Sequence, residues 1–296
     1  MPEICEVTLT AEILEKFFKG KILKEVKIHD GRYKKNPPEG FEIFASYLKN
    51  HPMTIKSIET KGKFLYFTLV DETGKKAYIM NTFGLEGMWS LLKVEFYKIS
   101  FETTEGKKFW FNDMRNFGTF KFTFDKKELD KKLNKLAPDF LKSNMSCEEL
   151  QEQFENLSDK NQSKKILIIL MDQGLVGSGL GNYLVPEILY RAKISPHQTI
   201  ENMTDEQYES LCKAIKHVLK LCYLANKTGY MEYLTEYLPK LKKKNYLPET
   251  KLKKNEEFAF LVYRQDKDPL GNKVKAEKII KDRTAYWVPS VQKQIN

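Results

Sequence analysis

The sequence predicts an α+β protein of two domains, a β-rich first half and a helical second half. Its 296 residues favour two domains over one, because a domain averages about 150 residues. Hydrophobic residues make up 41% and aromatic residues 12%, enough for packed cores. The hydrophobic period changes from strand-like to helix-like near the charged stretch Lys126–Lys135. We therefore expect an N-terminal domain over residues 1–130 and a C-terminal domain over residues 131–296.

The first half is predicted to contain one helix followed by strands. An apolar stripe at helical spacing indicates a helix within Val7–Phe18, and Gly20 follows where a helix stop is expected. We expect Gly31–Gly40 to be a loop. Runs rich in Val, Ile, Phe and Tyr, with short polar separators, favour a mostly antiparallel β-sandwich. These runs are Ile22–His29, Thr54–Val70, Ala77–Phe83, Glu95–Phe101, Lys108–Asn112 and Gly118–Phe124.

The second half carries helix signals. Ser146 with Glu149, and Thr204 with Gln207, have the spacing of capping boxes, in which each side chain satisfies a backbone N–H at the helix start. The predicted helices are Lys164–Asp172, Leu180–Ala192 and Asp205–Asn226.

Two short β-like runs near the end predict a hairpin. Phe258–Arg264 and Lys278–Trp287 are separated by turn-forming residues. These turn residues are Asp268, Pro269, Gly271 and Asn272. Arg283 lies in the second run, where an arginine could bind a phosphate through two parallel hydrogen bonds. An exposed hairpin arginine without a special role is the alternative.

The positive charge is concentrated at the C-terminus. The formal net charge is +10, and residues 240–296 contain 15 basic against 7 acidic residues. Such a surplus indicates a polyanionic partner, because neutralised phosphates release their counterions. A solvated, lysine-rich face explains the same charge, and both interpretations stay open.

Other classes of protein are excluded by composition. The longest apolar run, Ile166–Met171, is far shorter than the roughly 18 residues of a membrane span. Glu3 and Glu6 lie where a signal peptide would be basic and then apolar, so we expect an intracellular protein, cytoplasmic or nuclear, that is not secreted. The cysteines lie far apart, and we expect reduced thiols. They are Cys5, Cys147, Cys212 and Cys222.

Pro2 is the first candidate for catalysis. If Met1 is removed, Pro2 presents a secondary amine, and a terminal amine titrates near pH 8, below the roughly 10.4 of lysine. Such an amine is often neutral at pH 7, so it can attack an electrophilic carbon. Glu3 and Glu6 lie close enough in sequence to transfer protons. A chance Met-Pro-Glu start is the alternative.

Glycines form a second candidate site at Gly177–Tyr183, between two helical stretches. Glycines let backbone N–H groups converge on an anion, and the following helix adds its dipole. Asn182 could donate to the same phosphate. A glycine-rich turn without a ligand remains the alternative.

Two glycine-containing loops could fill the gap left by a base taken out of a duplex. Asn81–Gly87 contains Leu85, and Asp113–Gly118 contains Arg115 and Phe117. Judged locally, Leu85 and Phe117 are expected to be core residues.

Taken together, the order of these motifs resembles the formamidopyrimidine-DNA glycosylase/endonuclease VIII family. The order begins with Met-Pro-Glu-x-x-Glu, continues through Lys61-Gly-Lys63 and Asp113–Gly118, and ends with Met171–Val176, Gly-Leu-Gly-Asn182-Tyr and Glu187-Ile-Leu. The resemblance implies a helix-two-turns-helix region over residues 131–255 and a finger hairpin over residues 256–296. It also implies a bifunctional DNA glycosylase and abasic-site lyase of base excision repair, which acts through a Schiff base and then β,δ-elimination.

The resemblance also assigns residue roles. Pro2 would attack C1′ of a nucleotide flipped out of the duplex, with Glu3 and Glu6 assisting proton transfer. Lys63 would contact phosphate and support catalysis. The family usually has two arginines where this chain has Arg115-Asn116. The residues expected to bind DNA are Asn182, Arg283, Leu85, Arg115 and Phe117.

The finger departs from the usual family pattern. Most members hold it with four cysteines and zinc, but this chain has no cysteine after Cys222. This is similar to the zincless finger of endonuclease VIII-like members, so we expect no metal and no cofactor. The side chains expected to hold the hairpin by packing are Leu261, Tyr263, Tyr286 and Trp287.

The expected partner is damaged DNA, double-stranded or single-stranded, bound by a monomer that contacts no membrane. Zincless members favour oxidised pyrimidines and hydantoins, and we expect the same here. Two other functions were weighed. A DNA-binding protein that no longer cuts has no reason to keep Pro2, Glu3, Lys63 and Asn182 together. A basic RNA-binding protein leaves the glycine–asparagine turn unexplained.

Overall fold

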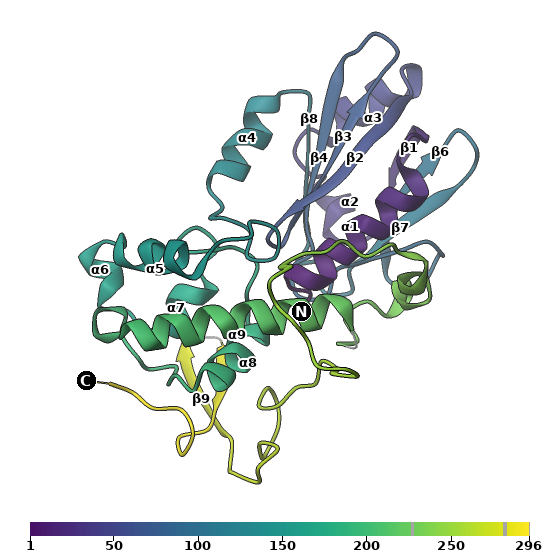
Figure 1. Ribbon diagram of the computed structural model, residues 1–296. Helices are drawn as coiled ribbons and strands as arrows, with labels where there is room; N and C mark the ends of the chain where they lie inside the picture. Colours follow the sequence, from purple (N-terminus) through teal and green to yellow (C-terminus); the bar gives the residue numbers. More distant parts are fainter. Residues whose placement is uncertain (226–227, 281–282, 296) are drawn as a thin grey trace. The chain divides into compact units, whose positions relative to one another are not determined.

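The computed structural model describes residues 1–225, 228–280 and 283–295 (Figure 1). The chain forms two compact units. The first comprises Met1–Pro2, Glu6–Lys135 and Gly229–Lys243; the second comprises Glu3–Cys5, Leu136–Thr228 and Lys244–Asn296. Among the helices of the described residues, none is long and apolar enough to cross a membrane.

The first unit is built on one antiparallel sheet, which confirms the predicted architecture. Its strand order is β5-β7-β6-β1-β2-β3-β4-β8. The strands are β1 (Ile22–Ile28), β2 (Met53–Lys61), β3 (Phe64–Val70), β4 (Lys76–Thr82), β5 (Met88–Ser90), β6 (Tyr97–Thr103), β7 (Lys108–Asn112) and β8 (Thr119–Thr123). The predicted run Thr54–Val70 is two strands, because Gly62 and Lys63 form a tight turn within it. Strand β5 was not predicted.

Aromatic packing curls this sheet. Phe67 on β3 lies 5.9 Å from Phe101 on β6, measured between ring centroids. Trp89 on β5 and Phe120 on β8 occupy opposite ends of the strand order, yet their ring centroids are 6.0 Å apart. The two layers of the expected sandwich are therefore two halves of one continuous sheet around a core of buried rings.

Helices α1 (Ile4–Phe18), α2 (Arg32–Lys35), α3 (Phe41–Asn50) and α4 (Lys126–Asn134) accompany the sheet. The prediction of a loop throughout Gly31–Gly40 is wrong, because α2 lies within it. We expected residues 229–243 to belong with the C-terminal domain, but they group with the first unit. Their 3₁₀ helix η2 (Glu232–Lys240) places Tyr237 with its ring centroid 5.4 Å from that of Phe17.

The second unit is helical, as predicted. Its helices are α5 (Cys147–Glu155), α6 (Asp159–Gln162), α7 (Ile166–Met171), α8 (Leu184–Ala192), η1 (Ile200–Asn202) and α9 (Asp205–Leu224). Both capping boxes are confirmed at Ser146 and Thr204. Helix α8 starts later than predicted because residues before Leu184 form the glycine turn, and the predicted end at Asn226 lies outside the described residues.

The expectation of four reduced thiols is wrong. Cys147 and Cys212 form a disulfide with Cα atoms 5.5 Å apart, which joins α5 to α9. A sequence separation of 65 residues hid this proximity, since only packing of the two helices creates it. Cys5 and Cys222 are buried and are not joined in a disulfide.

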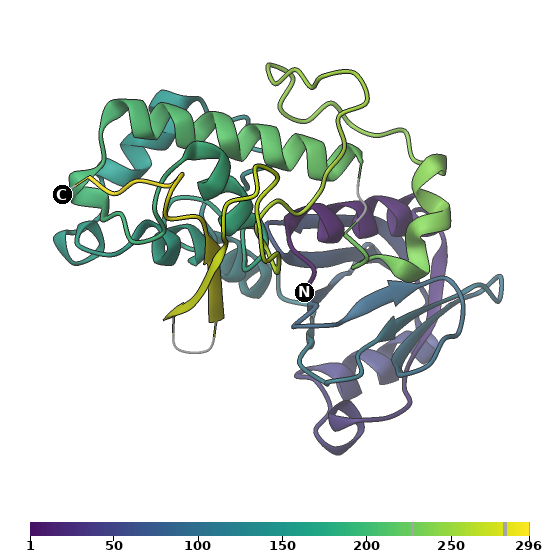
Figure 2. The ribbon, with the colours of Figure 1, turned by 90° about the horizontal axis from the view of Figure 1, so that it is seen from below.

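A C-terminal hairpin exists, but not the predicted one: the turn residues Asp268, Pro269, Gly271 and Asn272 precede both of its strands instead of joining them. Strand β9 (Lys275–Ile280) pairs with β10 (Arg283–Trp287), whereas Phe258–Arg264 forms no strand (Figure 2). Lys281 and Asp282, which belong to the predicted second strand, lie outside the described residues.

A buried carboxylate explains why Phe258–Arg264 is not a strand. Glu187 Oε1 accepts hydrogen bonds from the N–H groups of Leu261 (3.0 Å), Val262 (2.9 Å) and Tyr263 (2.9 Å). These amides are consequently not available for a β-ladder. As expected, Tyr263 packs against Tyr286, with ring centroids 5.3 Å apart.

Candidate active site

The glycine turn holds Glu3 and Ile4 within the second unit. Glu3 is fully buried, and its Oε1 accepts a hydrogen bond from the Tyr183 N–H at 2.9 Å. The Ile4 N–H donates to the Gly179 carbonyl at 3.1 Å. Tyr183 precedes the first residue of α8, where the helix dipole stabilises an anion. The carboxylate next to Pro2 is therefore fixed in position by the backbone of the turn.

Close packing explains the glycines of this turn. Gly179 has a φ of +118°, and a Cβ there would lie 2.4 Å from the Cδ1 of the buried Ile4. A Cβ on Gly177 would lie 2.2 Å from the Phe140 ring. Only glycine allows both approaches without displacing a buried side chain.

Gln173 stabilises the turn by two hydrogen bonds to its backbone, a role that sequence analysis missed. Its Oε1 accepts from the Gly179 N–H at 2.8 Å, and its Nε2 donates to the Leu180 carbonyl at 2.9 Å. The motif Met171–Val176 contained this residue, but only its position after the end of α7 could have suggested the role.

Asn182 presents a buried polar atom in the same turn. Its Oδ1 has no hydrogen-bond partner within the described part of the chain. A buried polar group is normally satisfied, so this amide has capacity for a ligand. Because the amide's oxygen and nitrogen exchange places by a half-turn, it can offer N–H donors to a phosphate.

The structure places Arg283 at the start of the loop that carries Asn182. Its Nη1 lies 4.0 Å from the Sδ of Met171, the last residue of α7. Arg283 begins strand β10 and is half-buried. Within residues 171–183 of the second unit, Arg283 therefore contacts the first residue, and the glycine turn forms the last part.

Lys63 and Glu6 are placed by elements of the first unit. Lys63 lies in the two-residue turn between β2 and β3, which the paired residues Lys61 and Phe64 close. Gly62 takes a φ of +56° there, which explains the glycine. Glu6 lies in the first turn of α1 and is fully buried.

The two loops expected to act as wedges lie side by side. A Cβ on Gly84 would lie 2.5 Å from the Phe117 carbonyl carbon, so the backbones nearly touch. Arg115 lies with its guanidinium carbon 5.1 Å from the Phe117 ring centroid and its Nη1 3.7 Å from Glu86 Oε1. Phe117 is 50% exposed and Leu85 is partly exposed, so the local expectation that both are core residues is wrong.

Asp113 supports the second loop from beneath, which sequence analysis also missed. Its Oδ2 accepts from the Tyr33 hydroxyl and from the Gly118 N–H, each at 2.7 Å. Burial, and then the hydrogen bond to Asp113, raise the pKa of Tyr33, so its hydroxyl stays protonated and donates. The hydrogen bonds of Asp113 therefore fix the two ends of the loop, and its tip is exposed.

The contacts within each unit assemble two groups of predicted residues. In the second unit Glu3 is bonded to the glycine turn that contains Asn182, whereas Arg283, within the described residues, contacts only Met171 among the predicted motifs; in the first unit Arg115 and Phe117 lie beside the loop of Leu85. Across residues 1–225, 228–280 and 283–295, no group of three or more His, Cys, Asp or Glu side chains could hold a metal ion.

Family models match most of the chain. The formamidopyrimidine-DNA glycosylase N-terminal domain matches residues 1–120, its H2TH domain residues 136–232 and its C-terminal domain residues 248–293. These matches cover the sheet, the glycine turn and the hairpin.

Curated relatives point the same way. A formamidopyrimidine-DNA glycosylase of Ureaplasma parvum is 32% identical over 229 residues, 75% of this chain and 78% of that protein. One from Bacillus licheniformis is 30% identical over 240 residues, 79% of this chain and 82% of its own.

Solved structures match the fold. A wild-type Lactococcus lactis enzyme bound to DNA containing an oxidised pyrimidine has a TM-score of 0.76 at 19% identity and covers 99% of this chain and 100% of that one. The same bacterium's enzyme bound to DNA with an abasic site has a TM-score of 0.75 at 20% identity and covers 98% and 99%.

Proposed function

The chain belongs to the formamidopyrimidine-DNA glycosylase family of base excision repair, and from this premise we propose that it removes oxidised bases through Pro2 and then cleaves the abasic strand. The observation that carries the proposal is the burial of Glu3 beside Pro2, with its carboxylate held by the Tyr183 N–H. Such a fixed carboxylate can direct a proton at the atom where Pro2 reacts.

The proposed reaction begins once Met1 has been removed, because the Pro2 nitrogen is otherwise an amide. The secondary amine attacks C1′ of the extruded nucleotide, and the bond from C1′ to the base breaks. The base departs with the electron pair and takes up a proton, and the Pro2 nitrogen loses the proton it carried as an amine. The ring oxygen O4′ then leaves C1′ and is protonated, with Glu3 as the acid, and an iminium joins Pro2 to C1′.

Strand cleavage follows from the iminium. Loss of a proton from C2′ expels the 3′ phosphate, and a second elimination expels the 5′ phosphate. Glu6 would assist the proton transfers, and Lys63 and Asn182 would each bind a backbone phosphate. Leu85, Arg115 and Phe117 would fill the gap in the duplex, since an extruded base leaves unstacked neighbours.

The finger is proposed to work without zinc. Residues 248–293 contain no cysteine, so the side chains present do not fit the four-thiolate site of a zinc finger. The Glu187 carboxylate and the valines Val262, Val274 and Val288 would hold the segment instead, with Arg283 bound to a phosphate. Elemental analysis should find no stoichiometric zinc, and its presence would contradict this part of the proposal.

Borohydride trapping tests the central step. Reduction during turnover on DNA with an oxidised pyrimidine should give a covalent adduct, and peptide mass spectrometry should place the deoxyribose on Pro2. The Pro2→Gly variant should lose the adduct. An adduct on a lysine, or active enzyme that retains Met1, would overturn the mechanism. A panel of oxidised bases in single- and double-stranded oligonucleotides would then rank pyrimidines and hydantoins against purines.

A further inference from the structure

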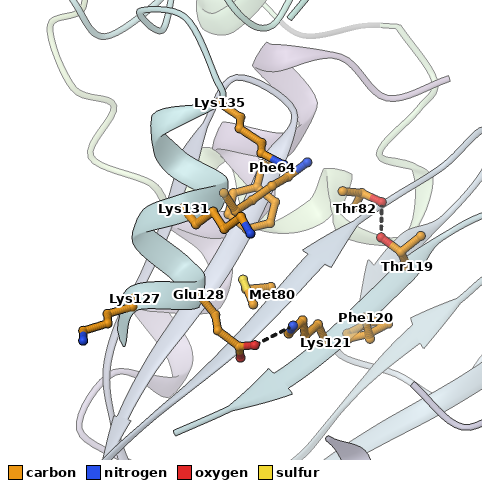
Figure 3. A pocket seen from close by; sticks show the side chains of 11 residues that line it. Phe64, Met80, Thr82, Thr119, Phe120, Lys121, Lys127, Glu128, Lys131 and Lys135 are labelled. Carbon is orange, nitrogen blue, oxygen red and sulfur yellow. Dashed lines mark hydrogen bonds and ion pairs between the residues drawn. The ribbon is translucent and has the colours of Figure 1, made fainter. Parts of the chain in front are cut away.

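A groove in the first unit is not used by the proposed reaction. It lies between α4 and strands β3, β4 and β8, and encloses a cavity of about 510 Å³ (Figure 3). Phe64, Met80 and Phe120 contribute its apolar floor, and each is at least nine-tenths buried. Thr82 and Thr119 line it as well, with their hydroxyls hydrogen-bonded to each other at 2.6 Å.

Unneutralised lysines form one wall of the groove. Lys131 and Lys132 on α4 are exposed, as is its C-cap residue Lys135, and none of the three has an ion-pair partner in residues 1–225, 228–280 and 283–295. Lys131 and Lys135 extend from the helix toward Phe64 in Figure 3, and the Lys132 ammonium lies 5.6 Å from the Phe64 ring centroid. Like charges gathered around one cavity create a positive potential that attracts an anion.

Neighbouring lysines show the contrast. Lys121 pairs with Glu128 at 2.8 Å and also with Glu39, and Lys126 pairs with Asp130 at 2.8 Å. Lys127, Lys131, Lys132 and Lys135 line the groove without an ion pair in the described residues. Five lysines and one glutamate line the groove, so its net charge is positive.

Three contacts fix the helix that carries these lysines. Asp125 caps its start by accepting from the Lys127 N–H at 2.9 Å. Leu129 is 4% exposed against the sheet, and the Lys61 ammonium donates to the Leu133 carbonyl at 2.9 Å near the helix end. Lys131 and Lys135, four residues apart, are therefore held about 6 Å apart along the helix axis.

The groove is continuous with the proposed site of the same unit. Phe64 on β3 pairs with Thr82 on β4. Lys63 directly precedes Phe64, and the turn with Leu85 begins two residues after Thr82. A DNA strand bound at Lys63 and Leu85 would therefore lie next to the groove.

We propose that this groove binds the sugar–phosphate backbone of DNA flanking the damaged nucleotide, with Lys131, Lys132 and Lys135 as phosphate contacts. Backbone phosphates recur about every 3.4 Å along the duplex axis, so lysines held about 6 Å apart can contact phosphates of the same strand. The threonine hydroxyls supply further donors to phosphate oxygens. That the flanked nucleotide is a lesion rests on the proposed function; the affinity for the backbone does not.

A double variant with a matched control tests the groove. Lys131→Gln with Lys135→Gln removes two charges and keeps most of each side chain, and Lys126→Gln removes one paired charge from the same helix. Fluorescence anisotropy would measure binding to abasic-analogue duplexes with long and with short flanks at several salt concentrations. On long flanks the double variant should bind about 10-fold more weakly, and its salt slope should fall by about 2. Lys126→Gln should bind like wild type.

The outcomes separate the two proposals. An equal loss on short and long flanks, or an unchanged salt slope, would overturn the groove proposal even if Pro2 trapping succeeds. If trapping fails while the double variant still loses affinity for undamaged DNA, the groove stands and the proposed reaction falls. Displacement of the long-flanked duplex by inorganic phosphate at low concentration, or by an acidic peptide better than by DNA, would also count against a backbone-binding groove.

Discussion

The two units are held together in different ways. The first relies on buried aromatic rings, with Phe67, Phe101 and Phe109 stacked inside the curled sheet. The second buries aliphatic side chains of its helices, such as Leu170, Ile188 and Leu219. It adds individual connections between distant segments, such as the Cys147–Cys212 disulfide and the Glu187 hydrogen bonds. Loss of one ring weakens a shared core, whereas loss of one connection releases a whole segment.

The loops of the two units differ in the same way. The glycine turn of the second unit is buried and bonded through Gln173 and Glu3. The loop of Arg115 and Phe117 in the first unit is anchored at Asp113 but exposed at its tip. This difference fits the proposed roles, in which Glu3 transfers a proton from a fixed position and Phe117 enters a DNA duplex that arrives from solvent.

The disulfide should give the largest effect. Replacing Cys147 and Cys212 by serine should lower the free energy of unfolding of the second unit by about 4 kcal/mol, because the disulfide closes a loop of 65 residues. Hydrogen exchange should accelerate in α5 and α9 and stay unchanged in β3 and β4. A reductant should lower the free energy of unfolding of the wild type and leave that of the variant unchanged. Equal acceleration of hydrogen exchange in both units would show that the disulfide does not stabilise the second unit alone.

Gly179→Ala should come next. The new Cβ would meet Ile4, which cannot move because it is fully buried, so we expect a loss of about 3 kcal/mol in unfolding free energy and reduced base excision. Gly271→Ala is the matched control: its φ is +84°, but a Cβ there meets nothing within 4 Å, so about 1 kcal/mol is expected. Equal losses in urea denaturation would show that strain alone, without the contact to Ile4, explains the glycine.

Phe117→Ala should separate function from stability. Because the side chain is half exposed, the unfolding free energy should change by less than about 0.5 kcal/mol. Affinity for lesion-containing duplex should fall about 10-fold through lost stacking on neighbouring bases. Met114→Ala, at a neighbouring position with 52% exposure, should bind like wild type. A lowered melting temperature would mean that Phe117 is structural.

Asp71 should give the smallest effect, confined to acid pH. Its hydrogen bond from Tyr47, followed by those from Thr73 and Lys75, lowers its pKa to about 2. A lowered pKa stabilises the folded state above the ordinary aspartate pKa near 4, and this contribution disappears as the pH falls toward 2. The first unit should therefore lose more stability across this pH range in the wild type than in the Asp71→Asn variant. Hydrogen exchange of β3 and β4 would measure this loss.

Sequence reasoning succeeded where a local pattern determines structure. A run rich in aromatic residues between polar separators gave β7 its bounds, Lys108–Asn112, and capping boxes located α5 and α9. The spacing of Phe41, Phe44 and Leu48 would also have indicated α3, since all three face the core.

It failed where a distant group competes for the backbone. Phe258–Arg264 has the composition of a strand, but three of its backbone N–H groups donate hydrogen bonds to Glu187, which lies more than 70 residues earlier. The family resemblance supplied the site residues, yet nothing local distinguishes Gln173 or Asp113 as their supports. Such contacts become visible only when the chain is folded.

The disulfide also has a consequence for limited proteolysis. Every residue from Cys147 to Cys212, including the turn that bears Asn182, lies inside one covalently closed ring. A protease that nicks an exposed peptide bond in this ring leaves two fragments that still migrate as a single band. The cut becomes visible only after reduction, so an intact band without reductant is no proof of an uncut polypeptide.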